Sequence, residues 1–253
     1  MKGNESGWYP VMLRLTGKRC VVVGGGPVAE RKVCSLLDAG ADGIVVISDR
    51  LTERLAEWET QGRIRAEHRP YREGDIQAAA LVIAATNDSE LNAHIVAQAE
   101  RLRIWVNTAD DGPSGDFVTP AVVRRGDLIV ALTTGGASPA LAARLKKELE
   151  RLLGEDYEPR LRALRLLRER LLGREAAAGG GIGVAEYDAA KRRLILRAAA
   201  EDEDGWRAVA ALLPAQSGRS GMAGEADVVA LHNTIELHDS LDQWIERLSG
   251  QHA

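Results

Sequence analysis

The first part of the chain alternates short apolar runs with longer segments in which apolar residues recur at helical spacing. The runs are too short for typical helices and contain few polar positions, as expected of strands that are covered on both faces. Because predicted helices separate these strands, the pattern over roughly the first 110 residues predicts an α/β fold with a doubly wound parallel sheet. The strands are expected at Cys20–Val23, Gly43–Ser48, Ala79–Thr86 and Ile104–Asn107, with a shorter one in "RIRAEHR".

The pattern changes near Asp116. The segment "DFVTPAVVRRGDLIVALTT" predicts two strands joined at Arg125-Gly126-Asp127, a hairpin-like turn. A helix is expected in "SPALAARLKKELERLL", where Ser138 suits the N-cap position and Pro139 the first helical position. These elements predict a small second αβ unit.

From Tyr157 the chain becomes helical and basic. An apolar stripe follows the predicted helix "EPRLRALRLLRERLLG", with arginines on its other faces; the stripe consists of Leu161, Leu164, Leu167 and Leu171. The connection "REAAAGGGIGVAEYD" precedes two short helices, in "AAKRRLILRAAA" and "GWRAVAALL". A linker, "PAQSGRSGMAGEAD", then leads to a last amphipathic helix in "VVALHNTIELHDSLDQWIERL".

Composition narrows the class of protein without identifying its chemistry. The chain has 253 residues, of which 45% are hydrophobic and 28% charged, as in ordinary globular proteins. It has no apolar run of membrane-spanning length and no N-terminal segment of the signal-peptide kind, so we expect a cytoplasmic protein that does not bind membranes. The net charge of -4 gives no argument for nucleic-acid binding. The two cysteines and five histidines show no metal-ligand spacing, so no bound metal is expected.

A glycine-rich turn lies between the first predicted strand and the first predicted helix. Within "VVVGGGPVAERK" it reads Gly24-x-Gly26-x-x-Ala29. The first glycine permits a tight turn, the second lets the backbone approach a pyrophosphate, and Ala29 allows the helix to pack closely on the strand. Free N–H groups at the helix N-terminus favour anions further. This turn, which includes Pro27 and Val28, therefore predicts a Rossmann-type NAD site; the alternative is a glycine turn that binds nothing.

Polar residues follow three other predicted strands at the same edge of the sheet. After the second strand, an acidic residue would bond the ribose 2′-hydroxyl of NAD, whereas an arginine would suit the 2′-phosphate of NADP. Asp49 thus favours NAD and Arg50 favours NADP, although a solvated turn explains either residue equally well. The other expected cofactor contacts are Ser48, Thr86, Asn87 and Asn107. Asn87, Asp88 and Ser89 also suit helix capping, and Ser89 is the expected N-cap of the next helix.

The stretch "VNTADDGPSGDF" places Asp110, Asp111 and Asp116 in a loop beyond the fifth strand. Loop aspartates are usually solvated turn formers, because Asp bonds to its own turn and Gly and Pro set the dihedral angles. A carboxylate at this edge would also face the substrate side of a nicotinamide ring. Position alone leaves open whether one of the three is an acid or a base.

Several motifs together resemble those of the precorrin-2 dehydrogenase / sirohydrochlorin ferrochelatase family, whose members make sirohaem. They are "LRLTGKRCVVVGGGPVAERKV", "IAATND" followed by "LN", "VNTADD" and "ALTTGGASPALAARLKKELE". The resemblance covers about residues 8 to 153 and continues more loosely to about Pro214. It implies an NAD-dependent dehydrogenase acting on precorrin-2, and it leaves open whether the chain also inserts Fe²⁺ as a ferrochelatase.

The resemblance also implies a division of labour along the chain. Residues 1–113 would form the NAD-binding Rossmann domain, 114–153 a dimerisation unit, and 154–214 a helical domain that covers the substrate. Residues 215–253 would be a linker and a tail helix of unknown role. The implied assembly is a homodimer, and Fe²⁺ would be a passing substrate rather than a bound metal.

The family's key aspartate lies in a motif of the form VNxxD, which places it at Asp110; Asp111 and Asp116 inherit no role. A serine before the Gly-Gly pair of some relatives is Thr134 here. Because the family's tetrapyrrole substrate carries many carboxylates, basic side chains and a helix N-terminus are candidates for binding it. The candidates are Gly135, Gly136, Ser138, Arg124 and Arg144, together with Arg125, Lys146 and Lys147; each basic residue alone is equally a solvated surface residue.

Two other functions fit part of the pattern. A dinucleotide-sensing regulatory module would share the glycine turn, but it would need neither a catalytic aspartate nor a covering helical domain. A dehydrogenase of a smaller acid would share the NAD site, and the long basic helical region argues mildly against it. Formation of NADH from NAD and precorrin-2 would distinguish a precorrin-2 dehydrogenase from both alternatives.

Overall fold

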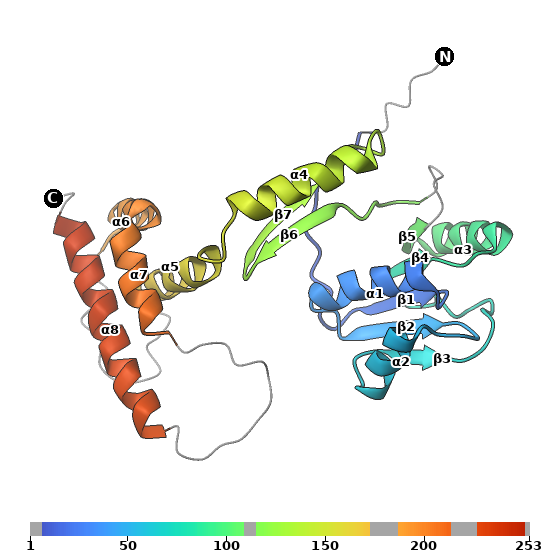
Figure 1. Cartoon of the computed structure of the whole chain (residues 1–253), viewed down its shortest axis with the longest axis horizontal. Helices are drawn as coiled ribbons and strands as arrows, with labels where there is room; N and C mark the ends of the chain where they lie inside the picture. The colour runs from blue at the N-terminus through green and yellow to red at the C-terminus, as the bar shows by residue number, and fades with distance from the viewer. Residues whose placement is uncertain (1–6, 109–114, 173–186, 214–226, 251–253) are drawn as a thin grey trace. The chain divides into compact units, whose positions relative to one another are not determined.

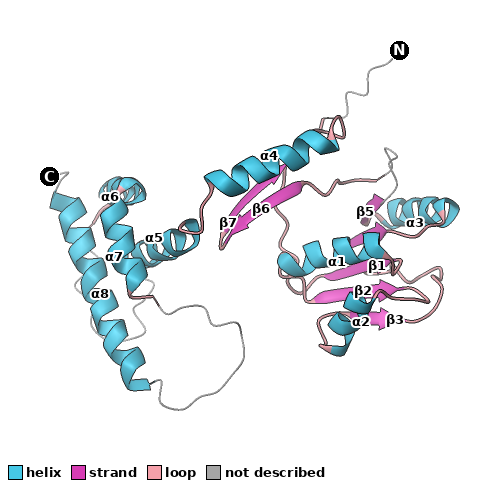
Figure 2. Cartoon of the chain, viewed as in Figure 1, coloured by secondary structure: helices cyan, strands magenta, loops and turns pink. Residues whose placement is uncertain are grey.

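The computed structural model describes residues 7–108, 115–172, 187–213 and 227–250 and divides the chain into two compact units (Figure 1). The first unit is Met1–Thr119 and the second is Pro120–Ala253. The first is an α/β unit, whereas the second begins with a two-stranded sheet and is otherwise helical (Figure 2). None of the described helices combines the length and the apolar character that crossing a membrane requires.

A parallel sheet forms the centre of the first unit, in the order β3-β2-β1-β4-β5. The chain runs outward from β1 to β3 and then crosses back to pair β4 with the other edge of β1. Ligands of open α/β sheets bind at such a reversal, outside the carboxyl ends of the strands. The predicted doubly wound sheet is thus confirmed. Its strands are β1 (Arg19–Val23), β2 (Gly43–Ile47), β3 (Arg65–Glu67), β4 (Leu81–Ala84) and β5 (Trp105–Thr108).

Three helices cover this sheet: α1 (Pro27–Asp38), α2 (Glu53–Thr60) and α3 (Ser89–Leu102). The N-cap of α3 is Asp88, whose carboxylate accepts hydrogen bonds from the backbone N–H groups of Glu90 and Leu91. The prediction that Ser89 caps this helix was therefore wrong by one residue. Aspartate caps well because its negative charge also lies at the positive end of the helix dipole.

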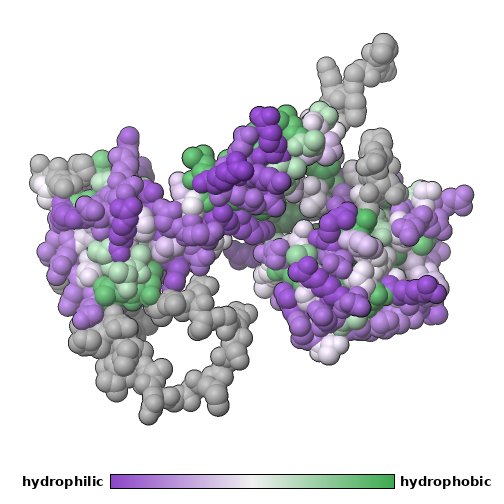
Figure 3. Space-filling model, in the orientation of Figure 1, coloured by the Kyte–Doolittle hydropathy of each residue, from purple (hydrophilic) through white to green (hydrophobic). Residues whose placement is uncertain are grey.

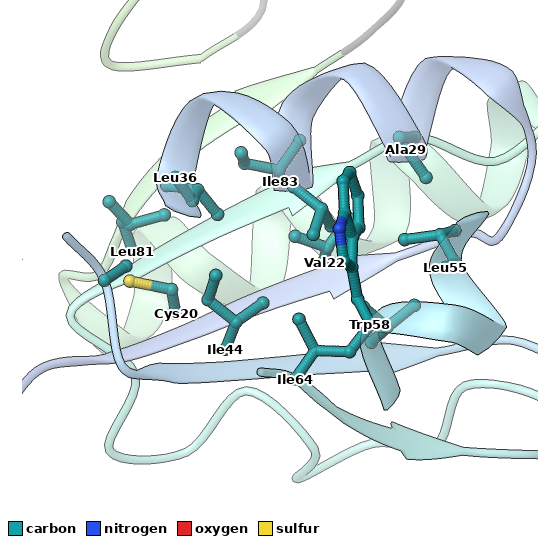
Figure 4. Packing of buried hydrophobic residues seen from close by; sticks show 14 of the residues in the cluster. Cys20, Val22, Ala29, Leu36, Ile44, Leu55, Trp58, Ile64, Leu81 and Ile83 are labelled. Atoms are coloured by element: carbon teal, nitrogen blue, oxygen red, sulfur yellow. The ribbon is translucent and has the colours of Figure 1, made fainter. Parts of the chain in front are cut away.

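Alternate residues of β1 face opposite layers of helices. Cys20 and Val22 pack beneath α1 and α2, in the cluster shown in Figure 4. Val21 and Val23 pack on the other face of the sheet, in a cluster with residues of α3. Burial on both faces explains why the strand is apolar from Cys20 to Val23. Burial, with Asp42 nearby, raises the pKa of the Cys20 thiol to about 11, so this thiol stays protonated.

The second unit begins with a hairpin of β6 (Ala121–Arg125) and β7 (Leu128–Leu132), followed by α4 (Pro139–Leu152). Gly126 in the hairpin turn has a positive φ of 55°, a conformation that favours glycine. Ser138 caps α4 by accepting a hydrogen bond from the N–H of Leu141 at 3.2 Å. Both the predicted turn and the predicted cap are confirmed.

Four further helices complete the second unit: α5 (Tyr157–Leu171), α6 (Ala189–Glu201), α7 (Glu203–Ala211) and α8 (Asp227–Gly250). They share one apolar core, to which the tail helix α8 contributes as fully as the others. Its contributions are Leu241, Trp244, Ile245 and Leu248, all buried.

One arginine of α5 departs from the predicted amphipathic pattern. Arg170 is buried, and its guanidinium forms two hydrogen bonds with the Asp242 carboxylate of α8, at 2.9 and 2.7 Å. Asp202, which caps α7, accepts a hydrogen bond from the indole N–H of Trp244 on α8 at 2.7 Å. Charged side chains thus join α8 to the rest of the helical unit, alongside the apolar core.

Candidate functional site

The carboxyl ends of the parallel strands meet at one edge of the sheet, and the glycine turn after β1 lies there. Gly24 has a φ of 120°, and a Cβ atom on it would lie 2.2 Å from the backbone oxygen of Ala85. A Cβ atom on Gly25 would lie 2.0 Å from the backbone oxygen of Arg50. The fold itself therefore requires glycine at both positions, because β4 and the β2–α2 connection approach the turn so closely.

Gly26 differs, because the fold does not require a glycine there. Its φ is -86°, and a Cβ atom built on it meets nothing within 4 Å. Gly26 is also the N-cap of α1, where no side chain caps the helix, so the first N–H groups of α1 remain available to a ligand. Open space at an uncapped helix N-terminus suits a pyrophosphate. The residues present therefore fit a dinucleotide cofactor.

The residues that follow β2 sit beside this turn. The hydroxyl of Ser48 donates a hydrogen bond to the backbone oxygen of Arg50 at 2.8 Å, and the N–H of Thr52 donates to the oxygen of Gly25 at 3.0 Å. These bonds fix the β2–α2 connection against the glycine turn. Asp49 and Arg50 are both exposed at its tip, so their side chains are free to meet a ribose or its phosphate.

The residues that follow β4 are held by a buried amide. The side chain of Asn92, only 1% exposed, accepts a hydrogen bond from the N–H of Thr86 at 3.2 Å and donates one to the oxygen of Thr86 at 3.1 Å. Asn92 thus fixes the backbone where β4 ends. Asn87, the next residue, is exposed at the same edge.

The end of β5 carries a polar cluster that joins it to α1. The ammonium of Lys32 donates hydrogen bonds to Asn107 Oδ1 and to Thr119 Oγ1, each at 2.8 Å. The amide nitrogen of Asn107 donates to the oxygen of Phe117, also at 2.8 Å, and Asn107 is only 6% exposed. Lys32, Asn107 and Thr119 are called the Lys32 cluster below. Burial, and next the charge of Arg31, lower the pKa of Lys32.

The expected catalytic residue, Asp110, lies outside the described residues, as does Asp111. The chain on either side of them is tied together at the end of β5. The Asp116 carboxylate accepts a hydrogen bond from the N–H of Val106 at 3.0 Å, and the N–H of Asp116 donates to the oxygen of Val106 at 2.8 Å. Asp116 thus has a structural role at the edge of the sheet.

The candidate substrate residues of the second unit fall into a turn and two arginines. Gly135 and Gly136 have φ values of 63° and 86°, and Cβ atoms on them would meet nothing within 4 Å. The hydroxyl of Thr134 closes this turn: it donates to the oxygen of Ser138 and accepts from its N–H, each at 3.1 Å. Threonine thus holds the turn through its hydroxyl, which serine also carries.

The basic candidates differ in whether other protein groups already bind their guanidinium groups. Arg125 is occupied, because its guanidinium donates to the backbone oxygens of Leu153 and Glu150, at 2.9 and 3.0 Å. Arg144 is highly exposed and pairs with Glu148 on its own helix at 3.1 Å. Arg124 is half-buried on β6. Within the described ranges, no group of three or more His, Cys, Asp or Glu residues is arranged to hold a metal ion.

Two family models match the chain in tandem. A model described as "Putative NAD(P)-binding" matches residues 11–121, which include the glycine turn and the Lys32 cluster. A second, described as "Sirohaem biosynthesis protein central", matches residues 125–152, which include β7 and α4. Residues 11–152 are thus similar to an NAD(P)-binding domain followed by the central part of sirohaem-biosynthesis proteins. The resemblance drawn from the motifs is thereby confirmed, and residues 11–121 match a dinucleotide-binding domain.

Individual members of the family are similar over the same region. A siroheme synthase of Nitrosococcus oceani is 43% identical over 150 residues, which are 59% of this chain and 32% of that protein. Siroheme synthase 3 of Aeromonas hydrophila is 37% identical over 172 residues, which are 68% of this chain and 36% of that protein. The chain thus spans about a third of the length of these relatives.

A solved structure extends the likeness beyond the two matched models. SirC, precorrin-2 dehydrogenase, has a TM-score of 0.60 and 27% sequence identity to this chain. The match covers 79% of this chain and 96% of that protein. The shared fold therefore continues past residue 152 into the helical part of the second unit.

Sequence reasoning missed Lys32 and Asn92. Asn92 lies in the quoted "LN" pair, but an asparagine on a helix is usually exposed, so nothing indicated that its amide is buried. Lys32 lies in the helix that follows the glycine turn, where helical spacing assigns it no partner. Only the packing of α1 on the sheet brings its ammonium to Asn107.

Proposed function

We propose that this chain catalyses the NAD-dependent dehydrogenation of precorrin-2 to sirohydrochlorin. The observation that carries the proposal is the open, uncapped turn at Gly26, in a chain that matches an NAD(P)-binding model over residues 11–121 and a sirohaem-biosynthesis model over residues 125–152. The likeness to a precorrin-2 dehydrogenase over 96% of that protein supports this substrate over a smaller acid. A regulatory module is less well supported, because it would have no need of the helical region that SirC shares.

NAD would bind along the edge formed by the ends of β1, β2, β4 and β5. The turn from Gly24 to Ala29, with the N–H groups of α1, would hold its pyrophosphate. Asp49 would bond the ribose hydroxyls and repel a 2′-phosphate, which favours NAD over NADP. Ser48, Arg50, Thr86, Asn87 and Asn107 stay predicted contacts. When bound, NAD accepts the hydride that leaves the substrate.

The reaction also releases a proton, and Asp110 is the residue proposed to accept it. Asp110 follows Asn107 closely in the sequence, in the position of the family motif, beyond the end of β5. A carboxylate there would act as a general base or orient a pyrrole N–H group. The substrate's carboxylates would be met by Arg124, by Arg144 and by the turn from Gly135 to Ser138.

The proposed assembly is a homodimer formed through β6, β7 and α4. The described structure gives α4 no buried residue, although the helix is amphipathic. Three large apolar side chains nearby are exposed: Ile129 by 37%, Leu141 by 42% and Leu152 by 75%. Figure 3 shows apolar surface around α4 among the charged side chains. A second copy of the chain would cover this surface, and a hairpin this small gains stability from such a partner.

The test is a steady-state assay of the purified protein with precorrin-2 and NAD, with and without Fe²⁺. We expect NADH absorbance to rise with wild type, and a sirohaem spectrum to appear only if ferrous iron is also a substrate. Asp110→Asn should lower kcat by about 10²- to 10⁴-fold while NAD affinity is retained, because an amide cannot act as a base.

Asp111→Asn is the matched control, since it shares the loop and the charge but not the motif position. If Asp111→Asn is inactive and Asp110→Asn is active, the catalytic carboxylate is Asp111 and the assignment of Asp110 is wrong. Wild-type protein that binds NAD but forms no NADH from precorrin-2 would refute the proposed function and leave a binding module as the better account.

A further inference from the structure

The Lys32 cluster presents a cation in the half of the site away from the ribose-reading residues. Lys32 lies in the second turn of α1, beyond the N–H groups available for pyrophosphate. Its ammonium reaches Asn107 at the end of β5, whereas Asp49 follows β2. In the sheet order, β1 and β4 lie between those two strands. The cluster therefore lies at the end of the site that is distant from the proposed adenosine ribose.

Both bonds of the Lys32 ammonium go to neutral oxygen atoms, an amide oxygen and a hydroxyl. Among the residues that the structure describes, none forms a salt bridge with Lys32. Burial, and next the like charge of Arg31, lower the pKa of Lys32. A partly buried cation without an anion is costly, and a neutral donor would join α1 to β5 at lower cost. Within the described residues, the charge of Lys32 is therefore left to an anionic ligand.

The contacts with described residues leave one N–H donor of the ammonium for such a ligand. A lysine ammonium has three N–H donors, and the structure uses two of them. Asn107 is fixed in turn by its bond to the oxygen of Phe117, so the acceptor that orients the ammonium is itself held in place. The remaining donor is thus pre-oriented rather than free to rotate.

We propose that the ammonium of Lys32, oriented by Asn107 and Thr119, binds a carboxylate of the tetrapyrrole substrate and so sets its position and affinity. This inference rests on the proposed function, because precorrin-2 supplies the carboxylates. The pyrophosphate of NAD is the competing anion. Lys32 is not needed for it, since the turn at Gly26 already offers open N–H groups.

Two substitutions separate the charge of Lys32 from its hydrogen bonds. Lys32→Gln keeps a donor for Asn107 and removes the charge, whereas Lys32→Arg keeps both. We expect Lys32→Gln to raise KM for precorrin-2 by about ten- to a hundredfold, the usual range for a lost charge-assisted hydrogen bond. The NAD dissociation constant from calorimetry should change less than about twofold, and Lys32→Arg should recover much of the substrate affinity. Arg31→Gln is the control, because it removes an exposed charge from the neighbouring position of α1.

Each result has a distinct meaning. Equal KM values for Lys32→Gln and wild type would overturn the proposal and leave Lys32 as a structural link. Weaker NAD binding with an unchanged KM would overturn it in favour of the phosphate. Circular dichroism shows whether Lys32→Gln folds. If it does not, Lys32→Arg is measured instead. A folded Lys32→Arg with unchanged affinity for sirohydrochlorin supports the proposal, whereas a folded Lys32→Arg that no longer binds sirohydrochlorin overturns it. Failure of the proposed function is separate, since wild type would then form no NADH.

Discussion

Three consecutive glycines follow β1, and each has different surroundings. A side chain on Gly24 or Gly25 would collide with the backbone of a neighbouring segment, whereas a side chain on Gly26 would enter open space. The fold therefore requires glycine at the first two positions, whereas at Gly26 a bound ligand would be the reason for glycine. This distinction predicts that substitutions at neighbouring glycines affect different properties.

At Gly26, substitution should abolish dinucleotide binding without unfolding the protein. In Gly26→Asp the carboxylate would occupy and repel the pyrophosphate site, so we expect calorimetry to show no NAD binding while the thermal midpoint stays near that of wild type. Wild type should bind NAD more tightly than NADP because of Asp49. Gly24→Ala is the contrasting variant and should lose stability, since its φ is 120° and its Cβ would meet Ala85. Normal NAD affinity in Gly26→Asp would remove this turn from the cofactor site.

At the scale of the element, the tail helix α8 is bound to α5 by an ion pair as well as by apolar packing. The side chains of Arg170 and Asp242 are only 8% and 20% exposed, so removing Asp242 takes this ion pair away from a buried guanidinium. We expect Asp242→Ala to lower the free energy of unfolding of the helical unit by about 3–5 kcal/mol, and by less if water reaches the Arg170 guanidinium. Replacing both residues, in Arg170→Met with Asp242→Leu, should cost less than the single change.

Urea denaturation followed by circular dichroism measures both changes. The matched control is Glu203→Gln, which breaks an exposed pair with Arg207 on one helix, where side-chain exposures are 60% and 56%. That control should shift stability by less than about 0.5 kcal/mol. If Asp242→Ala is as mild as the control, the ion pair with Arg170 contributes little to holding α8.

At the scale of the whole molecule, the periodic features were predictable and the long-range polar contacts were not. The apolar runs of β1 and β4 and the turn at Gly126 follow from local patterns, because each depends only on residues that are neighbours in the sequence. Arg170 was assigned to the polar face of its helix, since nothing near it in sequence announces Asp242 on α8. The same holds for Lys32, whose partners come from distant parts of the chain.

The candidate site divides in the same way. Its phosphate-binding turn is a local motif, so Gly24, Gly26 and Ala29 were identified directly from the sequence. The position of Asp110 was identified only by resemblance, because a loop aspartate has no local signature that separates a base from a turn former. Asn92 and Asp116, which fix the backbone at the ends of β4 and β5, are polar residues whose burial or pairing is a property of the assembled sheet.

The assembly of the whole molecule gives the last prediction, that the chain is a dimer through α4 and the hairpin. The apolar side chains Ile129 and Leu141 are exposed in the single chain, so a charge placed there should not disturb its interior. We expect light scattering at micromolar concentration to give a dimer for wild type and a monomer for Ile129→Glu with Leu141→Glu, because each buried interface would have to desolvate carboxylates. Leu102→Glu is the control, since Leu102 is 43% exposed but lies on α3 of the first unit. A monomeric wild type, or a control that dissociates as readily as the double variant, would place the interface elsewhere or exclude it.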